Sequence, residues 1–502
     1  FLYVVIRPVS YGAARYYSIL GARGIRELEQ TLNDLRIPEI VTDILGKDGD
    51  EFLKELFFEP LADKDIALYR LRVVSDLLKE DVYGAVSQFV DGVRKALSLL
   101  SLEREIYYDE HKIGIHLDAA LAYINAIDTF LEKARKLTLE SEGLSQFVAY
   151  LSWIVKNPSF QRLKEQALEA KRARERIRIR VRIKGDEIRV SKADNGESLV
   201  DLVRRVFSRF SYDVKTSFYQ GYATEITHIH AAILKGAFKI YEQEYATLKN
   251  FYLNFPDIVD QGIAQFIQEI EFYIRYIRYM KNTFIYGFTM PIFTHGELYV
   301  KGFYNPLLVK GRRVVLNDLE GDGSRKIFVI TGMNGGGKTT FATSLGVVAY
   351  LARLGLPVPA SEARLPFFNK ILTAYPVEEG EQVSKLERDV IRAWEILRMA
   401  DENTLVIANE LFTNTTSEEG TQLSRLFLDE VAKRGAYCLY VTFFSEVAKL
   451  GYVVSLVTAP DPGDPEKPSY KIVPGPPPSE YMAVRIAKKH SLEYNKIIGM
   501  VR

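Results

Sequence analysis

One stretch decides the fold of the C-terminal part of the chain: Ile327-Phe-Val-Ile-Thr-Gly332-Met-Asn-Gly-Gly-Gly337-Lys338-Thr339-Thr340. It begins with a short apolar run rich in β-branched residues and passes into a glycine-rich loop. An apolar segment with helical spacing, Phe341–Leu354, follows the loop. We therefore predict a strand, a loop and a helix in this order.

The loop has the spacing G-x-x-x-x-G-K-[ST], which is typical of loops that bind nucleotide phosphates. Glycines let the backbone N–H groups turn toward the phosphates, and the following helix adds its positive dipole end. We expect Lys338 to contact the β- and γ-phosphates and the Thr339 hydroxyl to bind Mg²⁺. An ordinary Gly-rich turn is the alternative, and the Lys-Thr after four glycines argues against it. The predicted ATP-binding residues of the loop are Gly332, Asn334, Gly335, Gly336, Gly337, Lys338, Thr339 and Thr340.

The bulk composition is that of a globular protein. The chain has 502 residues, of which 47% are hydrophobic and 26% charged, so it has at most about three domains. The net charge of +1 means that any nucleic-acid binding must come from local patches of basic residues.

The single cysteine, Cys438, is expected in the core and fits a reducing compartment. No apolar run is long enough to span a membrane, so we expect a cytoplasmic protein. The pair His228 and His230 lacks nearby partners for a metal site.

Residues 1–300 are predicted to be mainly helical, because long amphipathic runs there contain few Pro and Gly. Their apolar stripes are interpreted as the core of a helix bundle. The candidate helices are Ala22–Leu35, Ala119–Leu137, Leu144–Val155, Leu199–Lys215 and Gln261–Thr283.

A basic hairpin near residues 171–192 interrupts the helical pattern. Arg176–Ile183 alternates with period 2, Lys184-Gly-Asp186 forms a turn, and Glu187–Ser191 returns, which predicts a β-hairpin. The segment from Lys171 to Lys192 holds ten Lys/Arg against three Asp/Glu. Arginines on one strand face repel each other, and phosphate binding would relieve this repulsion. A solvated strand face with acidic neighbours is the alternative. The predicted DNA-binding residues are Arg176, Arg178, Arg180 and Arg182.

Residues 301–502 have the pattern of an α/β domain, in which short β-branched runs alternate with helices. Asp461–Ser479 is rich in Pro and Gly and is predicted to be a loop, and Tyr481–Leu492 a final amphipathic helix. The predicted strands are Arg313–Leu316, Ile327–Thr331, Thr404–Ala408, Ala436–Thr442 and Val453–Thr458.

A second polar pair follows the strand that ends at Ala408. P-loop enzymes place there one residue that holds the Mg²⁺ shell and one carboxylate that orients the attacking water. We predict Asn409 for the first role and Glu410, together with Lys338, for catalysis. An Asp is usual at position 409, and an amide adds no negative charge. Weaker metal binding and slower ATP hydrolysis are therefore expected.

These motifs resemble those of the MutS family of DNA mismatch-repair ATPases. The resemblance rests on the P-loop Val329–Thr340, on the segment Gly355–Leu365, and on Asn409-Glu-Leu-Phe-Thr-Asn-Thr-Thr416-Ser, which is similar to the family's D-E-x-G-R-G-T-S-T. Phe57–Asp63 and Ile66–Arg70 look like the start of the family's helical core, and Tyr481–Lys489 like its closing helix. The likeness extends over most of the chain, and the ATPase motifs carry it most specifically.

The resemblance implies a helical core and lever domain with a small β-hairpin clamp over residues 1–300, followed by a P-loop ATPase domain over 301–502. It implies ATP and Mg²⁺ as cofactors, and duplex, mismatched or branched DNA as a partner. Asn317 matches a motif beside the adenine, and Thr416 matches a serine that reaches the ATP of the partner subunit, which implies a homodimer. Ser384 and Asp389 lie where the family carries an S…E segment.

The chain also departs from the family pattern. Asn409 replaces Asp, and Phe443 replaces a histidine. The mismatch-reading domain is expected to precede residue 1 or to be absent, and no nuclease domain is expected after the last helix. The leading hypothesis is an ATP-gated dimeric clamp on DNA in repair or recombination. The alternative is an ATP-binding switch or scaffold in a DNA-processing complex, with little hydrolysis and no mismatch recognition. A transporter ATPase is disfavoured, because the chain lacks a Leu-Ser-Gly-Gly-Gln-type motif.

Overall fold

The computed structural model describes residues 18–47, 49–184, 187–193, 228–310, 314–321, 323–376 and 384–477. These residues belong to two compact units. Described residues of the first unit are drawn from 77–140 and 144–268, and those of the second from 18–76, 141–143 and 269–477. The predicted helices Leu199–Lys215 and Tyr481–Leu492 lie outside the described residues. The division into residues 1–300 and 301–502 stays a prediction.

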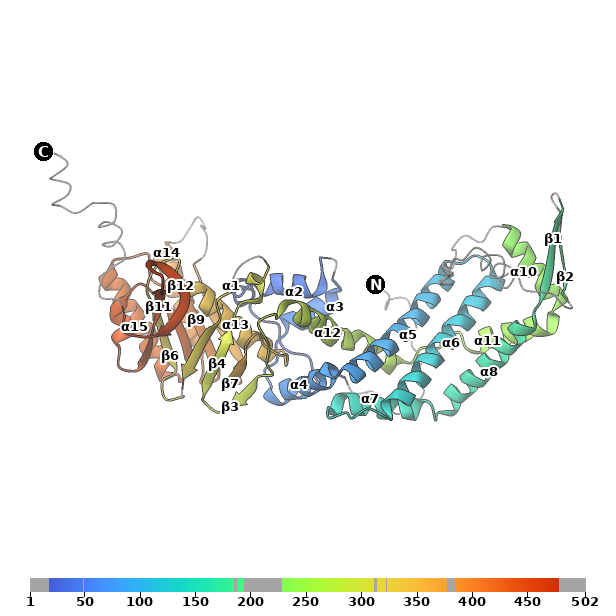
Figure 1. Ribbon diagram of the computed structural model, residues 1–502, viewed down its shortest axis with the longest axis horizontal. Helices are drawn as coiled ribbons and strands as arrows, with labels where there is room; N and C mark the ends of the chain where they lie inside the picture. Colours follow the sequence, from blue (N-terminus) through green and yellow to red (C-terminus); the bar gives the residue numbers. More distant parts are fainter. Residues whose placement is uncertain are drawn as a thin grey trace. The chain divides into compact units, whose positions relative to one another are not determined.

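The first unit is a helix bundle that carries one hairpin. Long apolar faces hold it together: α5 and α6 lie side by side in Figure 1, and a Cβ at Gly92 would approach Ala126 Cβ to 2.7 Å. Phe147 stacks on Phe266 with ring centroids 3.5 Å apart. The elements lying within this unit, or almost wholly so, are α5 (Glu80–Glu105), α6 (Asp109–Ala134), α7 (Glu142–Ile154), α8 (Pro158–Arg176), β1 (Ile179–Lys184), β2 (Glu187–Lys192), α10 (His228–Ile240) and α11 (Glu242–Asn254).

The predicted hairpin is present, with a later start than expected. β1 and β2 pair antiparallel, with Val181 opposite Val190. Val190 packs against α10, where its side chain lies 3.2 Å from the position of a Cβ at Gly236. Arg176 is the last residue of α8 and not part of the strand. The basic, Ala-rich run before it continues the helix, so the period-2 pattern describes the backbone only from Ile179 onward.

Besides the first two residues of α7, two helices contribute residues to both units: α4 (Lys64–Leu78) and α12 (Gln261–Thr283). α12 has the bounds that its apolar spacing predicts. Its buried face includes Ile270, Tyr273 and Ile277. Within the described ranges, no helix has the length and apolar character needed to cross a membrane.

The second unit is built on a six-stranded sheet of order β12-β11-β6-β10-β9-β8. All neighbours pair in parallel except β11 and β12, which are antiparallel. The carboxyl ends of β6 and β9 therefore lie at the same edge of the sheet, on either side of β10. The strands are β6 (Ile327–Thr331), β8 (Lys370–Ala374), β9 (Thr404–Asn409), β10 (Tyr437–Val441), β11 (Val453–Asp461) and β12 (Asp464–Pro474).

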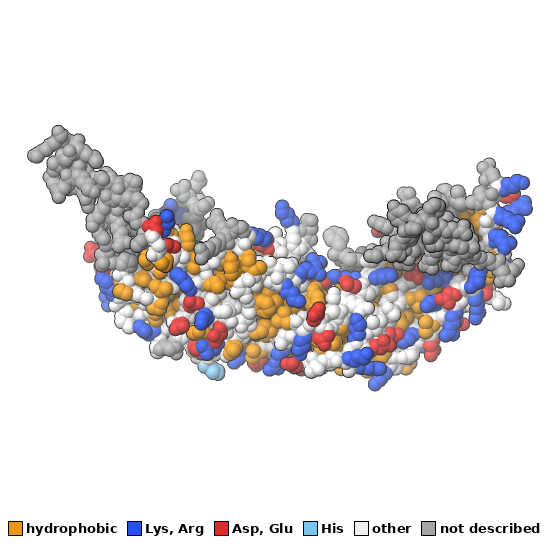
Figure 2. All heavy atoms as spheres, viewed as in Figure 1, with side chains coloured by type: hydrophobic (Ala, Val, Ile, Leu, Met, Phe, Trp, Pro, Cys, Tyr) orange, Lys and Arg blue, Asp and Glu red, His pale blue; other side chains and the backbone are white. Residues whose placement is uncertain are grey.

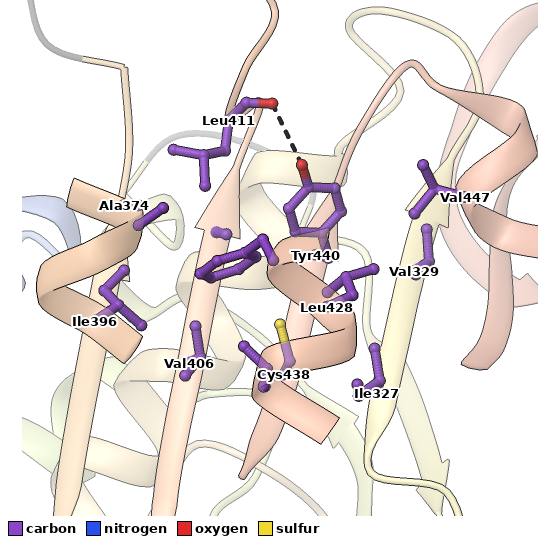
Figure 3. Packing of buried hydrophobic residues seen from close by; sticks show 14 of the residues in the cluster. Ile327, Val329, Ala374, Ile396, Val406, Leu411, Leu428, Cys438, Tyr440 and Val447 are labelled. Atoms are coloured by element: carbon purple, nitrogen blue, oxygen red, sulfur yellow. Dashed lines mark hydrogen bonds between the residues drawn. The ribbon is translucent and has the colours of Figure 1, made fainter. Parts of the chain in front are cut away.

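Both faces of this sheet are buried at its central strands, since every residue of β6, β9 and β10 is buried and successive side chains point to opposite sides. On one face, side chains from β6, β9 and β10 pack with those of α14 (Lys385–Met399) and α15 (Ser417–Lys433), as Figure 3 shows for Ile396, Val406, Leu428 and Cys438. Cys438 is fully buried, as expected from its apolar neighbours. On the other face lies α13 (Lys338–Arg353), whose Gly346 would place a Cβ 2.8 Å from Ile407.

A smaller sheet and the N-terminal helices complete the second unit. The sheet has the order β3-β7-β4-β5. The N-terminal helices join the larger sheet directly: the Thr31 hydroxyl donates to the Ile371 carbonyl at 3.1 Å. The remaining elements are α1 (Glu29–Asp34), α2 (Ile37–Leu45), α3 (Glu51–Phe58), β3 (Ile292–Thr294), β4 (Leu298–Phe303), η2 (Pro306–Leu308), β5 (Asn317–Gly321), β7 (Glu362–Pro366) and η3 (Ser445–Lys449).

Besides the hairpin and the predicted helix Ala119–Leu137, most of which belongs to the longer α6 (Asp109–Ala134), three predicted segments differ from the structure. Ala22–Leu35 is helical only from Glu29, because residues 25 and 27 hydrogen-bond to the carbonyls of Pro60 and Phe58 instead. Arg313 of the predicted strand Arg313–Leu316 lies outside the described residues, residues 314–316 are not in a strand, and β5 runs from Asn317 to Gly321. Asp461–Ser479, predicted to be a loop, contains β12. β12 is an edge strand, where proline is tolerated because one side of the backbone needs no donor.

Candidate functional site

The glycine-rich loop joins β6 to α13 at the carboxyl edge of the larger sheet. Gly332, Gly335 and Gly337 all have positive φ, at 124°, 69° and 92°. A Cβ at Gly332 would lie only 2.1 Å from the Thr458 hydroxyl oxygen. The backbone path of the loop therefore requires glycine here. Asn334 and Gly335 are exposed at the tip of the loop, and Thr339 and Thr340 are exposed in the first turn of α13.

Lys338 is the first residue of α13, and its ammonium lies inside the loop. Its Nζ donates to the carbonyl oxygens of Gly332 at 3.1 Å and Met333 at 3.0 Å. The side chain is 4% exposed, and burial lowers the pKa of its ammonium, while the charge of Glu410 opposes the shift. The Phe443 ring centroid lies 4.9 Å from Nζ. The Lys338 ammonium thus lies where it could contact a phosphate bound by the loop.

The two residues predicted to hold Mg²⁺ lie together. The Thr339 hydroxyl donates to Asn409 Oδ1 at 3.0 Å, which links α13 to the end of β9. Hydroxyl and amide oxygens are acceptable ligands for Mg²⁺, which usually takes the rest of its shell from water and substrate phosphates. The pair fits such an ion only with phosphate oxygens present, because it brings no negative charge. Among the residues that the structure describes, no group of three His, Cys, Asp or Glu could hold a metal.

Glu410 follows Asn409 directly at the start of a tight turn. Its φ is 58°, and its N–H donates to the Val441 carbonyl at 2.9 Å. Its charge acts on Lys338 across the site. The structure thus brings Lys338, Thr339, Asn409 and Glu410 to one edge of the sheet, as the two sequence motifs predict.

Asn317 is buried and bonded to the backbone of β12. Its Nδ2 donates to the Tyr470 carbonyl at 3.1 Å, and its Oδ1 accepts from the Ile472 N–H at 2.9 Å. Tyr470 has a φ of 61° and is 51% exposed. A Cβ at Gly337 would lie 3.5 Å from Tyr470 Cβ, so this aromatic residue borders the loop. Tyr470 was not among the predicted site residues, because Asp461–Ser479 was predicted to be a loop. The alternation Ser469-Tyr-Lys-Ile-Val473 was the available signal.

Thr416 caps the N-terminus of α15. Its hydroxyl accepts the Glu419 N–H at 3.2 Å. A contact of Thr416 with the ATP of a partner subunit stays a prediction. Ser384 has the same capping role at α14, where it accepts the Glu387 N–H at 3.2 Å.

The predicted DNA-binding arginines are all exposed but do not all belong to one strand face. Arg180 lies opposite Ser191 and Arg182 opposite Arg189, so these side chains share a face of the hairpin. Arg178 precedes β1, and Arg176 ends α8. Figure 2 shows basic side chains gathered at this hairpin. The hairpin face that carries Arg182 thus also carries Arg189, a cation that was not among the predicted DNA-binding residues.

The region that contains the glycine-rich loop is similar to known proteins. Residues 328–460 match the family model MutS domain V. This part of the chain is similar to MutS domain V. The match begins in β6 and ends in β11, so the matched region includes the glycine-rich loop, Asn409 and Glu410.

Curated relatives are similar to this chain over part of its length. The chain is 32% identical over 174 residues to the DNA mismatch repair protein MutS of Thermotoga petrophila, which is 34% of this chain and 22% of that protein. It is 32% identical over 170 residues to the MutS of Thermus aquaticus, or 33% of this chain and 20% of that protein. It is 30% identical over 240 residues to the endonuclease MutS2 of Staphylococcus aureus, or 46% of this chain and 30% of that protein. The chain thus spans less than a third of the length of each of these relatives.

Proposed function

We propose that the chain is a MutS-like ATPase that acts on DNA as an ATP-gated dimeric clamp. The observation that carries the proposal is the convergence of Lys338, Thr339, Asn409 and Glu410 at one sheet edge of the MutS domain V. These residues supply the charge, the metal ligands and the carboxylate that phosphoryl transfer to water requires.

Each group has a separate task in this proposal. The loop N–H groups and the start of α13 hold the phosphates, and Lys338 leaves its carbonyl partners to bind the β- and γ-phosphate oxygens. Thr339 and Asn409 would hold Mg²⁺ or its water ligands, and a bound ion would supply positive charge at the phosphates. Glu410 accepts a hydrogen bond from the attacking water and orients it toward the γ-phosphate. Tyr470 and the Asn317 clamp on β12 border the site where the loop meets α13.

Two features of the site support slow turnover. Asn409 holds the metal shell with a neutral amide where a carboxylate would bind more strongly. Phe443 places an aromatic ring near the Lys338 ammonium and offers no group that could carry a proton. These observations favour the second candidate, an ATP-binding switch or scaffold with little hydrolysis. Glu410 and the intact loop favour an active enzyme.

DNA is the proposed partner of the hairpin. Exposed cations on one face of β1 and β2 contact phosphates by charge and not by base sequence. Thr416 is proposed to reach the nucleotide of a second copy, which gives two shared sites in a homodimer. Mismatched or branched DNA would be bound through the same backbone contacts.

Steady-state ATP hydrolysis, measured with and without duplex DNA, tests the proposed function. We expect Mg²⁺-dependent release of phosphate at a rate that changes when duplex is added, because a clamp couples the two ligands. ATP binding without measurable turnover in either condition would favour the switch or scaffold. Absence of both ATP binding and turnover would contradict the proposal.

A further inference from the structure

The turn that carries Glu410 is strained. Glu410 and Phe412 both have left-handed backbone conformations, with φ of 58° and 63°. Residues with a Cβ rarely adopt the left-handed backbone region, and this conformation persists only where surrounding contacts hold it. Phe412 is 2% exposed, so its ring is fixed in the core. The direction of the Glu410 side chain therefore depends on what holds the backbone between these two residues.

Strand β10 holds one side of the turn. The Glu410 N–H donates to the Val441 carbonyl at 2.9 Å. The Tyr440 hydroxyl donates to the Leu411 carbonyl at 3.3 Å, as Figure 3 shows. Both bonds precede Phe412, so they leave the second strained residue to be fixed from elsewhere.

The other side of the turn is held by Asp389 of α14. Its Oδ2 accepts the Phe412 N–H at 3.0 Å, and its carboxylate also bonds the Asn414 side chain. A hydrogen bond to an ionised carboxylate is stronger than one between neutral groups. Asp389 thus fixes the backbone two residues after Glu410, and the side chain two residues further along.

A cavity next to the turn increases the importance of this contact. Asp389, Glu410 and Asn414 line one cavity of about 330 Å³ between α14, the end of β8 and the end of β9. On the side of α14, the turn borders this cavity and not packed side chains. Hydrogen bonds must therefore do what close packing does elsewhere in the core.

We propose that Asp389 is a positioning residue for ATP hydrolysis, because its carboxylate clamps the Phe412 N–H and thereby fixes the Glu410 carboxylate. The inference rests on the proposed function of Glu410. Asp389 does not contact the nucleotide. It acts only through the strained turn, so its loss affects the orientation of Glu410 and not the binding of ATP.

Kinetics of Asp389→Ala and Asp389→Asn test this role. Loss of a group that orients a reacting side chain lowers activity by about 10- to 100-fold, so we expect this fall in kcat for Asp389→Ala, with ATP affinity unchanged. Asp389→Asn keeps an oxygen that can accept the Phe412 N–H, and its kcat should lie between the wild type and Asp389→Ala. Glu387→Gln removes an exposed carboxylate from the same helix and is the matched control, with wild-type kcat expected.

Hydrogen exchange gives a readout that does not depend on turnover. In Asp389→Ala the amides of residues 410–414 should exchange faster, while those of the loop 332–337 keep wild-type protection. Wild-type kcat in Asp389→Ala would overturn the inference, as would parallel losses of kcat, ATP affinity and thermal stability. Glu410→Gln is assayed beside these variants. If it removes turnover while Asp389→Ala does not, only the positioning role fails. If it leaves turnover intact, the proposed role of Glu410 fails, and the positioning role of Asp389 fails with it.

Discussion

Replacing Glu410 with Gln is expected to lower kcat for ATP hydrolysis by about 10²- to 10⁴-fold, the range that general acid–base groups contribute. The amide is nearly isosteric, so the left-handed turn and its hydrogen bond to Val441 should survive. What is lost is the negative charge that orients the water and accepts its proton. Single-turnover kinetics with bound ATP measure this step directly.

ATP binding provides the control for this variant. Lys338 loses an opposing charge in Glu410→Gln, so ATP affinity should stay the same or rise. A matched carboxylate removal at Glu446, an exposed residue that pairs with Lys449, should leave both quantities at wild-type values. Turnover in Glu410→Gln within twofold of the wild type would remove Glu410 from the mechanism.

The second large effect is expected at the hairpin. Changing Arg176, Arg178, Arg180 and Arg182 together to Gln should weaken binding to every duplex alike, because phosphate contacts do not read sequence. The slope of log affinity against log salt should become shallower by up to about 3–4 units, at about 0.9 per phosphate contact. Salt titrations of binding to a labelled duplex measure this slope.

The structure refines the expected contribution of each arginine. Arg180 and Arg182 share a strand face, whereas Arg176 ends α8, so the pair in the strand should account for the larger part of the change. ATP affinity should be unaffected. A variant with Gln at four exposed cations of the second unit is the control for net charge and should keep the wild-type slope; these are Lys64, Arg425, Lys433 and Lys449. An unchanged slope in the hairpin variant would make the hairpin a solvated strand face and move DNA binding elsewhere.

Local sequence patterns predicted the helices and strands whose formation depends on the spacing of their own residues. β6 and α13 match the apolar run and the helical segment around the loop, and α12 matches its apolar spacing. These patterns failed where hydrogen bonds to a distant segment decide the secondary structure. β12 contains three prolines and is a strand because β11 lies beside it. Glu29 starts α1 because the residues before it bond to a distant segment.

The same distinction applies to the candidate site. Lys338, Thr339, Asn409 and Glu410 could be found because each lies in a short motif, and the structure brings them together. Tyr470 reaches the loop through strand pairing, which no local pattern reports. Asp389 lies in a segment that the family resemblance selects, but its bond to Phe412 depends on how α14 packs beyond β9. The positioning role of Asp389 could therefore be inferred only from the structure.

The most direct test of the account is the binding of ATP, followed by calorimetry, in the wild type and in Lys338→Ala. The account predicts a Mg²⁺-dependent heat of binding in the wild type and loss of high-affinity binding in Lys338→Ala. Both proteins should have similar unfolding temperatures, because the Lys338 ammonium interacts only with two loop carbonyls and the Phe443 ring among the contacts described above. Equal ATP affinity in the two proteins would contradict the assignment of the glycine-rich loop as the nucleotide site.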